Sequence, residues 1–243
     1  MQSASESIGI VEHEPGDLTC IVDGALRLSA LQALLAKHEQ RFSLDPPGDP
    51  TLAECLLRDL SGPLRHRFGT MRDLVIGVSV VLPDGTHAHS GGKVVKNVAG
   101  YDLGKLYCGS EGRLGTVERL ALRLHPRPAA ARTVVTGAER WGELHRSGLV
   151  PSAVDVVEDR MFVLFEGALQ AVDGQAAALG GDSVDPWAEV RALQAGLPGR
   201  KRWDGERAPL VRPGPRVAYV EEPVEQRWSA LAERVVEQLC NPS

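Results

Sequence analysis

A proline-rich segment at residues 125–131, HPRPAAA, constrains the fold of this chain more than any other feature. Proline has no backbone N–H to donate to a sheet, and it biases the residue before it toward extended conformations. A strand that ends at Leu124 should therefore leave its sheet here and enter a linker. Because 243 residues suffice for two small domains, we expect domains at residues 1–130 and 131–243.

Charge and cysteine spacing exclude several classes of protein. The chain has 27 Lys and Arg against 32 Asp and Glu, so a basic surface for nucleic acid or an anionic membrane is not expected. It has no run of eighteen apolar residues and no secretory pattern at its start, which predicts a cytoplasmic protein without a membrane span. Cys20, Cys55, Cys108 and Cys240 form no CxxC pair, so we expect ordinary thiols and no metal site.

Helices and strands should alternate before the linker. Ser29 with Gln32, and Thr51 with Glu54, have the spacing of capping boxes that open two helices. Pro83-Asp84-Gly85 is typical of a hairpin turn between strands. In the strand at residues 116–124, Leu120, Leu122 and Leu124 should point inward, with Arg119, Ala121 and Arg123 outward. The other expected strands cover residues 18–22, 42–44, 75–82 and 86–89.

The second half is expected to contain strands, helices and one irregular loop. A loop rich in Pro, Gly and Arg at residues 199–215 is expected to carry no regular structure. We expect strands at residues 133–136, 153–157 and 161–166, and helices at 168–179, 187–197 and 225–239.

Residues 61–73, SGPLRHRFGTMRD, are the first candidate binding segment. Their glycines would let main chain approach a ligand, and Arg65, Arg67 and Arg72 could neutralise a phosphate or carboxylate. A solvated basic loop would have the same composition, so both interpretations stay open.

The stretch at residues 91–117 is the stronger candidate. Its glycines, ending in Gly109, Gly112 and Gly115, would expose the successive N–H groups that a pyrophosphate or a flavin edge requires. They lead into a strand and no GKS or GKT follows, so the stretch is neither a dinucleotide fingerprint nor a Walker loop. A plain connection rich in turns would contain the same glycines.

Other chemistry-bearing residues are weaker candidates. Glu12, His13 and Glu14 are adjacent on an extended segment, where alternate side chains point to opposite faces. His87 and His89 share a strand face without a third ligand, so we expect surface residues. Ser110 is not in a nucleophile elbow, because its strand would follow the turn.

The sequence of residues 91–128, GGKVVKNVAGYDLGKLYCGSEGRLGTVERLALRLHPRP, closely resembles the FAD-binding subunit of glycolate oxidase. That subunit belongs to the vanillyl-alcohol-oxidase-like, PCMH-type FAD-binding flavoprotein superfamily. The resemblance covers about residues 8–130 and includes the specific motif KNVAGYDL at residues 96–103.

The resemblance implies an α+β fold: a PCMH-type FAD-binding domain lacking its first subdomain, followed by a small α+β cap-like domain. It implies FAD as the cofactor and a small 2-hydroxy acid as the substrate. Other subunits of a glycolate oxidase-like complex, including an iron–sulfur subunit, would be the partners. The positions that match the family's flavin contacts are Ser61, Gly62, Gly69, Gly112, Gly115 and Val117.

The chain also departs from the family pattern. It starts after the subdomain whose glycine-rich loop cradles the FAD pyrophosphate, and Ala53-Glu54-Cys55 replaces a Gly-Gly pair. A carboxylate at that position should oppose an anion. Two functions follow: an FAD-dependent oxidoreductase subunit, or a non-catalytic, FAD-free subunit that keeps the fold. No catalytic residue can be assigned, since His145, the histidine of the cap region, lies outside any matching motif.

Overall fold

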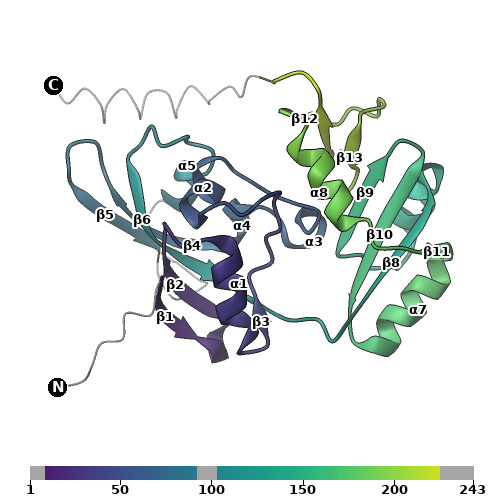
Figure 1. Ribbon diagram of the computed structural model, residues 1–243, viewed down its shortest axis with the longest axis horizontal. Helices are drawn as coiled ribbons and strands as arrows, with labels where there is room; N and C mark the ends of the chain where they lie inside the picture. Colours follow the sequence, from purple (N-terminus) through teal and green to yellow (C-terminus); the bar gives the residue numbers. More distant parts are fainter. Residues whose placement is uncertain (1–8, 92–102, 225–243) are drawn as a thin grey trace.

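The computed structural model describes residues 9–91 and 103–224. Two antiparallel sheets, one of five strands and one of seven, lie beside each other along the long axis (Figure 1). The mixture of helices with antiparallel sheets confirms the predicted α+β class. The expected helix at 225–239, Cys240 and all of the KNVAGYDL motif except Leu103 lie outside the described residues.

The five-stranded sheet has the order β1-β2-β6-β4-β5, with every neighbouring pair antiparallel. Strand β6 (Thr116–Arg123) lies in the middle and joins strands that come much earlier in the sequence. The predicted hairpin is confirmed, since Asp84 Oδ1 accepts from Thr86 N at 2.8 Å inside its turn. The other elements are β1 (Ile10–Glu14), the 3-10 helix η1 (Pro15–Asp17), β2 (Thr19–Asp23), β4 (Val75–Val81) and β5 (His87–Gly91).

Burial along β6 follows the expected alternation with one exception. Leu120, Leu122 and Leu124 are buried as predicted, but Ala121, predicted to face solvent, is also buried. The prediction is wrong there because β6 has a paired strand on each side, and a methyl group is too short to reach past its neighbours.

Short helices share one hydrophobic core with this sheet. Helix α2 (Leu52–Leu57) begins at the predicted capping box, where Glu54 N donates to Thr51 Oγ1 at 3.2 Å and Thr51 N donates to Glu54 Oε2 at 2.7 Å. The first part also contains α1 (Leu28–Ala36), α3 (Arg65–Phe68), α4 (Met71–Leu74) and α5 (Leu103–Tyr107).

The second predicted capping box is wrong. Helix α1 begins after Arg27, which makes no side-chain cap. Ser29 is already inside the helix, and its N and Oγ donate to the Asp49 carboxylate at 2.9 and 2.8 Å. A tertiary partner twenty residues away therefore takes the place of the local cap that the spacing suggested.

The proline-rich segment is not entirely free of sheet structure. Strand β7 (His125–Pro126) pairs with β3 (Gln40–Arg41) in a two-stranded ladder, and β8 begins at Ala130. Arg127 N also donates to Glu39 O at 2.8 Å. Proline tolerates these edge positions because its missing N–H is not needed there. The linker therefore runs along the first half of the structure before it enters the second sheet.

The seven-stranded sheet has the order β11-β8-β10-β9-β13-β14-β12. The predicted strands at 133–136, 153–157 and 161–166 lie within β8, β9 and β10. The predicted helices at 168–179 and 187–197 are confirmed as α7 and α8, although α7 begins at Leu169 and α8 ends at Ala195. Its elements are β8 (Ala130–Gly137), η2 (Ala138–Arg140), α6 (Trp141–Arg146), β9 (Ala153–Val157), β10 (Arg160–Gly167), α7 (Leu169–Leu179), β11 (Asp182–Ser183), α8 (Trp187–Ala195), β12 (Gly199–Arg202), β13 (Leu210–Arg212) and β14 (Val217–Val220).

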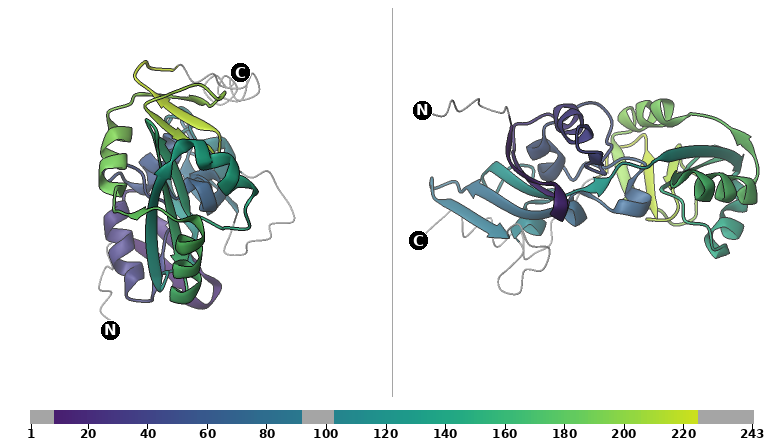
Figure 2. Two further views of the ribbon diagram at one scale, coloured as in Figure 1. Left: turned by 90° about the vertical axis from the view of Figure 1, so that its right-hand side faces the viewer. Right: turned by 90° about the horizontal axis from the view of Figure 1, so that it is seen from below.

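Both faces of this sheet are covered. Along β10, Met161, Val163 and Phe165 join one core with α6 and α7, while Phe162 joins another core with α8. Figure 2 shows the helices on the two sides of the sheet. Within the described residues, no helix is both long enough and apolar enough to cross a membrane.

The prediction of an irregular loop at residues 199–215 is wrong, because β12 and β13 lie in it. Arg212, in β13, is fully buried. Its guanidinium donates to both carboxylate oxygens of Asp155, which is also fully buried, at 3.0 to 3.1 Å. A charge that is neutralised by a neighbouring strand can occupy a sheet position that an isolated charge could not.

Replacing Asp155 with alanine should lower the free energy of unfolding by about 3–5 kcal/mol, because it leaves the Arg212 guanidinium buried and unpaired. The control is Asp173→Ala, which removes an exposed ion pair to Arg132 and should cost about 1 kcal/mol or less. Urea unfolding followed by circular dichroism measures both. Equal losses in the two variants would contradict the role assigned to the buried pair.

Candidate functional site

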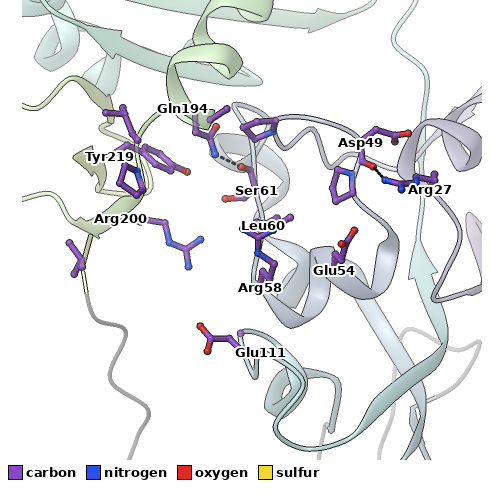
Figure 3. A pocket seen from close by; sticks show the side chains of 17 residues that line it. Arg27, Asp49, Glu54, Arg58, Leu60, Ser61, Glu111, Gln194, Arg200 and Tyr219 are labelled. Atoms are coloured by element: carbon purple, nitrogen blue, oxygen red, sulfur yellow. Dashed lines mark hydrogen bonds between the residues drawn. The ribbon is translucent and has the colours of Figure 1, made fainter. Parts of the chain in front are cut away.

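The main candidate site is a cleft of about 670 Å³ between the two sheets (Figure 3). One wall comes from the end of α2 and the turn after α5, and the other from the end of α8 with β12 and β14. The volume is within the range of small-molecule sites, roughly 300–1,000 Å³. The labelled lining residues are Arg27, Asp49, Glu54, Arg58, Leu60, Ser61, Glu111, Gln194, Arg200 and Tyr219.

Ser61 is held in the cleft by a chain of hydrogen bonds from the second sheet. Gln194 Nε2 donates to Ser61 O at 2.8 Å, and Gln194 Oε1 accepts from the buried Arg212 guanidinium at 2.7 Å. Arg212 also donates to Tyr219 Oη at 2.5 Å. A glutamine fixed at both ends cannot rotate without losing a charge-assisted bond. The orientation of the Ser61 carbonyl is therefore set by the second sheet.

Asp59 forms a second connection across the cleft. Arg200 donates to Asp59 O at 2.7 Å and to Asp59 Oδ2 at 2.9 Å. The Cys108 thiol donates to Asp59 Oδ1 at 3.2 Å, and burial together with the nearby carboxylate raises the pKa of this thiol. Cys108 is therefore protonated and serves as a hydrogen-bond donor. Asp59 joins α2, the turn after α5 and β12 at one point.

Asp45 holds the segment that follows Ser61. Its Oδ1 accepts from Leu64 N at 3.0 Å, and its Oδ2 lies 3.8 Å from Arg191 on α8. Burial raises the pKa of Asp45 to about 7, although the Leu64 amide and the guanidiniums of Arg212 and Arg191 oppose that rise. A Cβ at Gly62 would collide with the main-chain carbonyl of Asp45. Glycine is therefore required at position 62 by the packing of this segment.

Several charged residues that line the cleft form hydrogen bonds with residues of the first half of the structure. Asp49 binds Ser29, and Arg27 donates to Asp49 O at 2.6 Å. Glu54 belongs to the Thr51 capping box, and that hydrogen bond lowers its pKa, so it stays ionised. The cleft therefore contains both signs of charge.

The amides of the first turn of α2 are also used internally. Leu52 N donates to Leu26 O, Ala53 N to Gly24 O, and Glu54 N to Thr51 Oγ1. These three N–H groups are not available to a phosphate, and the Glu54 carboxylate lies beside them. This agrees with the expectation that Ala53-Glu54-Cys55 opposes an anion at that position.

Only one of the six predicted flavin contacts, Ser61, lines the cleft. Gly62 follows it, and Gly69 closes α3, where a Cβ would collide with the Asp73 side chain. Gly112 is exposed with a φ of +80° and open space around its Cα. Ser61, Gly62, Gly69 and Gly112 therefore remain predictions as flavin contacts.

The last two predicted contacts lie in the five-stranded sheet. A Cβ at Gly115 would collide with the Val81 carbonyl, so glycine allows the turn to approach β4 closely. Val117 is buried and borders a separate cavity of about 540 Å³ that His87 and His89 also line. Gly115 and Val117 also remain predictions as flavin contacts.

The arginine-rich segment at 61–73 is mostly helical, forming α3 and α4, and two of its arginines bind protein groups. Arg65 donates to Ser61 Oγ at 3.2 Å, and Arg67 donates to Ser152 Oγ at 3.3 Å across the junction between the sheets. Burial lowers the pKa of Arg65 from its ordinary high value. Arg72 is exposed. Structural use of Arg65 and Arg67 therefore accounts for much of this basic composition.

The histidine and cysteine candidates show no arrangement for metal binding. His87 and His89 are exposed as expected, and His87 Nδ1 lies 3.1 Å from Glu118 Oε2. His145 is exposed at the end of α6, next to the Trp141 ring. In the part of the chain that the structure describes, no group of three or more His, Cys, Asp or Glu side chains could hold a metal ion.

Sequence reasoning missed Gln194, Arg200 and Tyr219 as cleft residues. Arg200 lies in the segment predicted to be irregular, and Gln194 is one of several polar residues on an amphipathic helix. Buried and exposed side chains do not alternate along residues 217–220, because the first three of these residues are all buried. Knowing that Asp155 pairs with Arg212 would have identified this wall of the cleft, but nothing in the linear sequence indicates that pairing.

Comparisons with known proteins show similarity to FAD-binding proteins. Residues 4–91 match the family model described as an FAD binding domain. The chain is 31% identical to the glycolate oxidase subunit GlcE of Escherichia coli over 76% of its own length and 56% of that protein. It is 30% identical to the mitochondrial D-lactate dehydrogenase [cytochrome] 1 of Saccharomyces cerevisiae, over 65% of this chain and 28% of that enzyme.

A solved structure of alkyldihydroxyacetonephosphate synthase matches with a TM-score of 0.61 and 18% identity. The match covers 75% of this chain and 44% of that one, and it shows a shared fold. The chain thus spans about half, or less, of the length of these relatives.

Asp45→Asn should stabilise the protein increasingly as the pH rises from about 4 to about 7. The raised pKa means that the folded state keeps a proton that the unfolded chain releases near pH 3.8, so ionising Asp45 costs stability over that window. Asparagine can still accept from Leu64 N. Urea unfolding of both proteins at several pH values tests this, with Asp182→Asn, at an exposed position, as the control. A stability difference that does not change with pH would refute it.

Proposed function

We propose that this chain, which is similar to the family of PCMH-type FAD-binding flavoproteins, is the FAD-binding subunit of an oxidoreductase that acts on a small 2-hydroxy acid. FAD is the cofactor of this family. The observation that carries the proposal is the open cleft beside Ser61, at the segment where the sequence predicts flavin contact. If side chains of the protein filled this cleft, only the shared fold would support the proposal.

The cleft fits the ring end of the cofactor better than its phosphates. Leu60, Ser61 and Gly109 line the space, and the Gln194 bond keeps the Ser61 carbonyl in place. In this proposal those groups orient the flavin, and the junction between the sheets limits access of water. When bound, FAD supplies the ability to accept two electrons from the 2-hydroxy acid.

We propose that the phosphates of FAD are held mainly by groups outside the described residues. The amides at the start of α2 are occupied, and Glu54 adds a negative charge. Arg58 is exposed at the edge of the cleft and is the described cation best placed to assist. A second chain of the complex, or a segment of the full protein, would supply the remaining contacts.

The partners and the domain division are part of the same proposal. The relative from Escherichia coli is by its name a subunit of glycolate oxidase, which supports assembly with other subunits. We propose that an iron–sulfur subunit is among them. The division into residues 1–130 and 131–243 is supported by the hydrophobic cores. One buried core ends at Leu124, and the others begin at Val134.

A second function is favoured by one specific observation. The closed capping box of α2 leaves that helix without free amides, as expected for a subunit that keeps the family fold but no longer binds FAD. Such a subunit would be structural and non-catalytic.

The two functions differ in the amount of flavin that the protein carries. The chain, purified together with its partner subunits, loaded with FAD and desalted, should release about one flavin per copy of the chain on acid treatment. Ala195→Trp should reduce the FAD affinity at least about tenfold, because Ala195 lines the cleft and indole would fill it. Ala192→Trp is the matched control, since Ala192 is exposed on the same helix and does not line the cleft. A colourless protein that cannot be loaded would favour the FAD-free subunit.

Glu54→Gln should raise the FAD affinity by about three- to tenfold, because it removes a carboxylate near the phosphates while its amide oxygen still caps Thr51 N. Glu54→Gly should lose much of that gain, since it also removes the side chain that accepts from Thr51 N and so destabilises the start of α2. Fluorescence titration with FAD measures both variants. If Glu54→Gln binds FAD no better than the unaltered protein, the charge at this position does not oppose the cofactor.

A further inference from the structure

A second pocket, remote from the cleft, lies on the seven-stranded sheet. It encloses about 480 Å³ and shares no lining residue with the cleft. Its lining includes Val156 of β9 and Val211 of β13, which form the single residue pair that joins these two strands. The ladder stops there, where β9 turns toward β10 and a loop precedes β13. This short pairing between β9 and β13 leaves room for the pocket.

Two tryptophans line this pocket. Trp141 begins α6, and Trp203 follows β12. Trp203 Nε1 donates to Glu206 O at 2.8 Å, which restrains its indole. Tryptophan offers the strongest face for a cation among the aromatic side chains. Neither ring is needed to close the cores of the sheet, because Trp203 is outside them and Trp141 only packs against one.

Carboxylates dominate the charged part of the lining. They belong to Glu139, Glu158, Asp159 and Glu206, and they come from three separate segments of the chain. The lining has a single cation, Arg207, which lies 3.4 Å from Asp159 and is itself exposed. The pocket thus combines apolar and aromatic surface with an excess of negative charge.

We propose that this pocket docks an arginine side chain of a partner protein. Its negative charge complements a guanidinium, and a planar guanidinium stacks on an indole face while its stem covers the valines. The same charge excludes an anionic membrane or a nucleic acid as the occupant. We name the pocket defined by Trp141, Trp203, Val156 and Val211 the tryptophan pocket. Its occupancy does not depend on FAD.

Three blocked pentapeptides, each with one central residue between glycines, test the proposal on the full chain. The central residue is arginine, norleucine or glutamate. The readout is the indole N–H signals of Trp141 and Trp203 in nitrogen-15 NMR spectra, assigned with single Trp→Phe variants. Trp187 is an internal control, because it is buried and its Nε1 donates to Thr133 Oγ1 at 2.8 Å.

The arginine peptide should shift the Trp141 and Trp203 signals saturably and leave Trp187 unchanged. Norleucine should bind about tenfold more weakly, and glutamate should show no binding, because cation–π and charge attraction are lost. The double variant Glu158→Lys/Glu206→Lys should lose the arginine response. Glu189→Lys, at an exposed position of α8 outside the pocket, should keep it.

Several outcomes would overturn the proposal. Equal binding of the norleucine and arginine peptides would make the pocket merely apolar, and an unchanged response in the double variant would place binding elsewhere. Guanidinium chloride that shifts the same signals at the same concentration as the arginine peptide would indicate a site for a small cation and not for a protein. If no probe shifted the Trp141 and Trp203 signals, the pocket would not bind an arginine side chain.

Discussion

The buried pair of Arg212 and Asp155 is the interaction on which the second half of this structure depends. Strands β13, β14 and β12 are joined to β9 by only one residue pair, Val211 with Val156. The ion pair lies next to that junction, with both side chains fully buried. Burying two charges is costly unless their remaining hydrogen bonds are satisfied. Here Tyr219 and Gln194 satisfy further donors of the guanidinium, so the charge joins two parts of the sheet.

The same pair determines one wall of the cleft. Gln194 connects Arg212 to the Ser61 carbonyl, and Arg200 connects β12 to Asp59. Both connections reach main-chain atoms of the first half, which a side-chain rotation there cannot release. Because the wall and the candidate flavin loop are joined in this way, a change inside the second sheet should alter the geometry at Ser61. If the second sheet merely packed against the first half without these hydrogen bonds, a change inside it would not reach Ser61.

Local patterns predicted local structure well, and they failed where distant residues decide. The Thr51 capping box and the hairpin at Asp84 depend on neighbours within three residues, and both are present. Ser29 fulfils the same local rule, but Asp49 takes its hydrogen bonds. In the segment at 199–215, composition predicted an irregular loop, since the partner of Arg212 lies 57 residues away and local composition does not reveal it. The cleft wall was missed for the same reason.

The start of α2 illustrates a conflict between stability and ligand binding. Its first amides can either close the helix from within or bind an anion, and here Gly24, Leu26 and Thr51 accept from them. Glutamate at position 54 completes the cap and adds a negative charge at the cleft. Both effects favour the helix over a phosphate. The amides at the start of α2 are therefore not free to bind a pyrophosphate, whatever ligand the cleft holds.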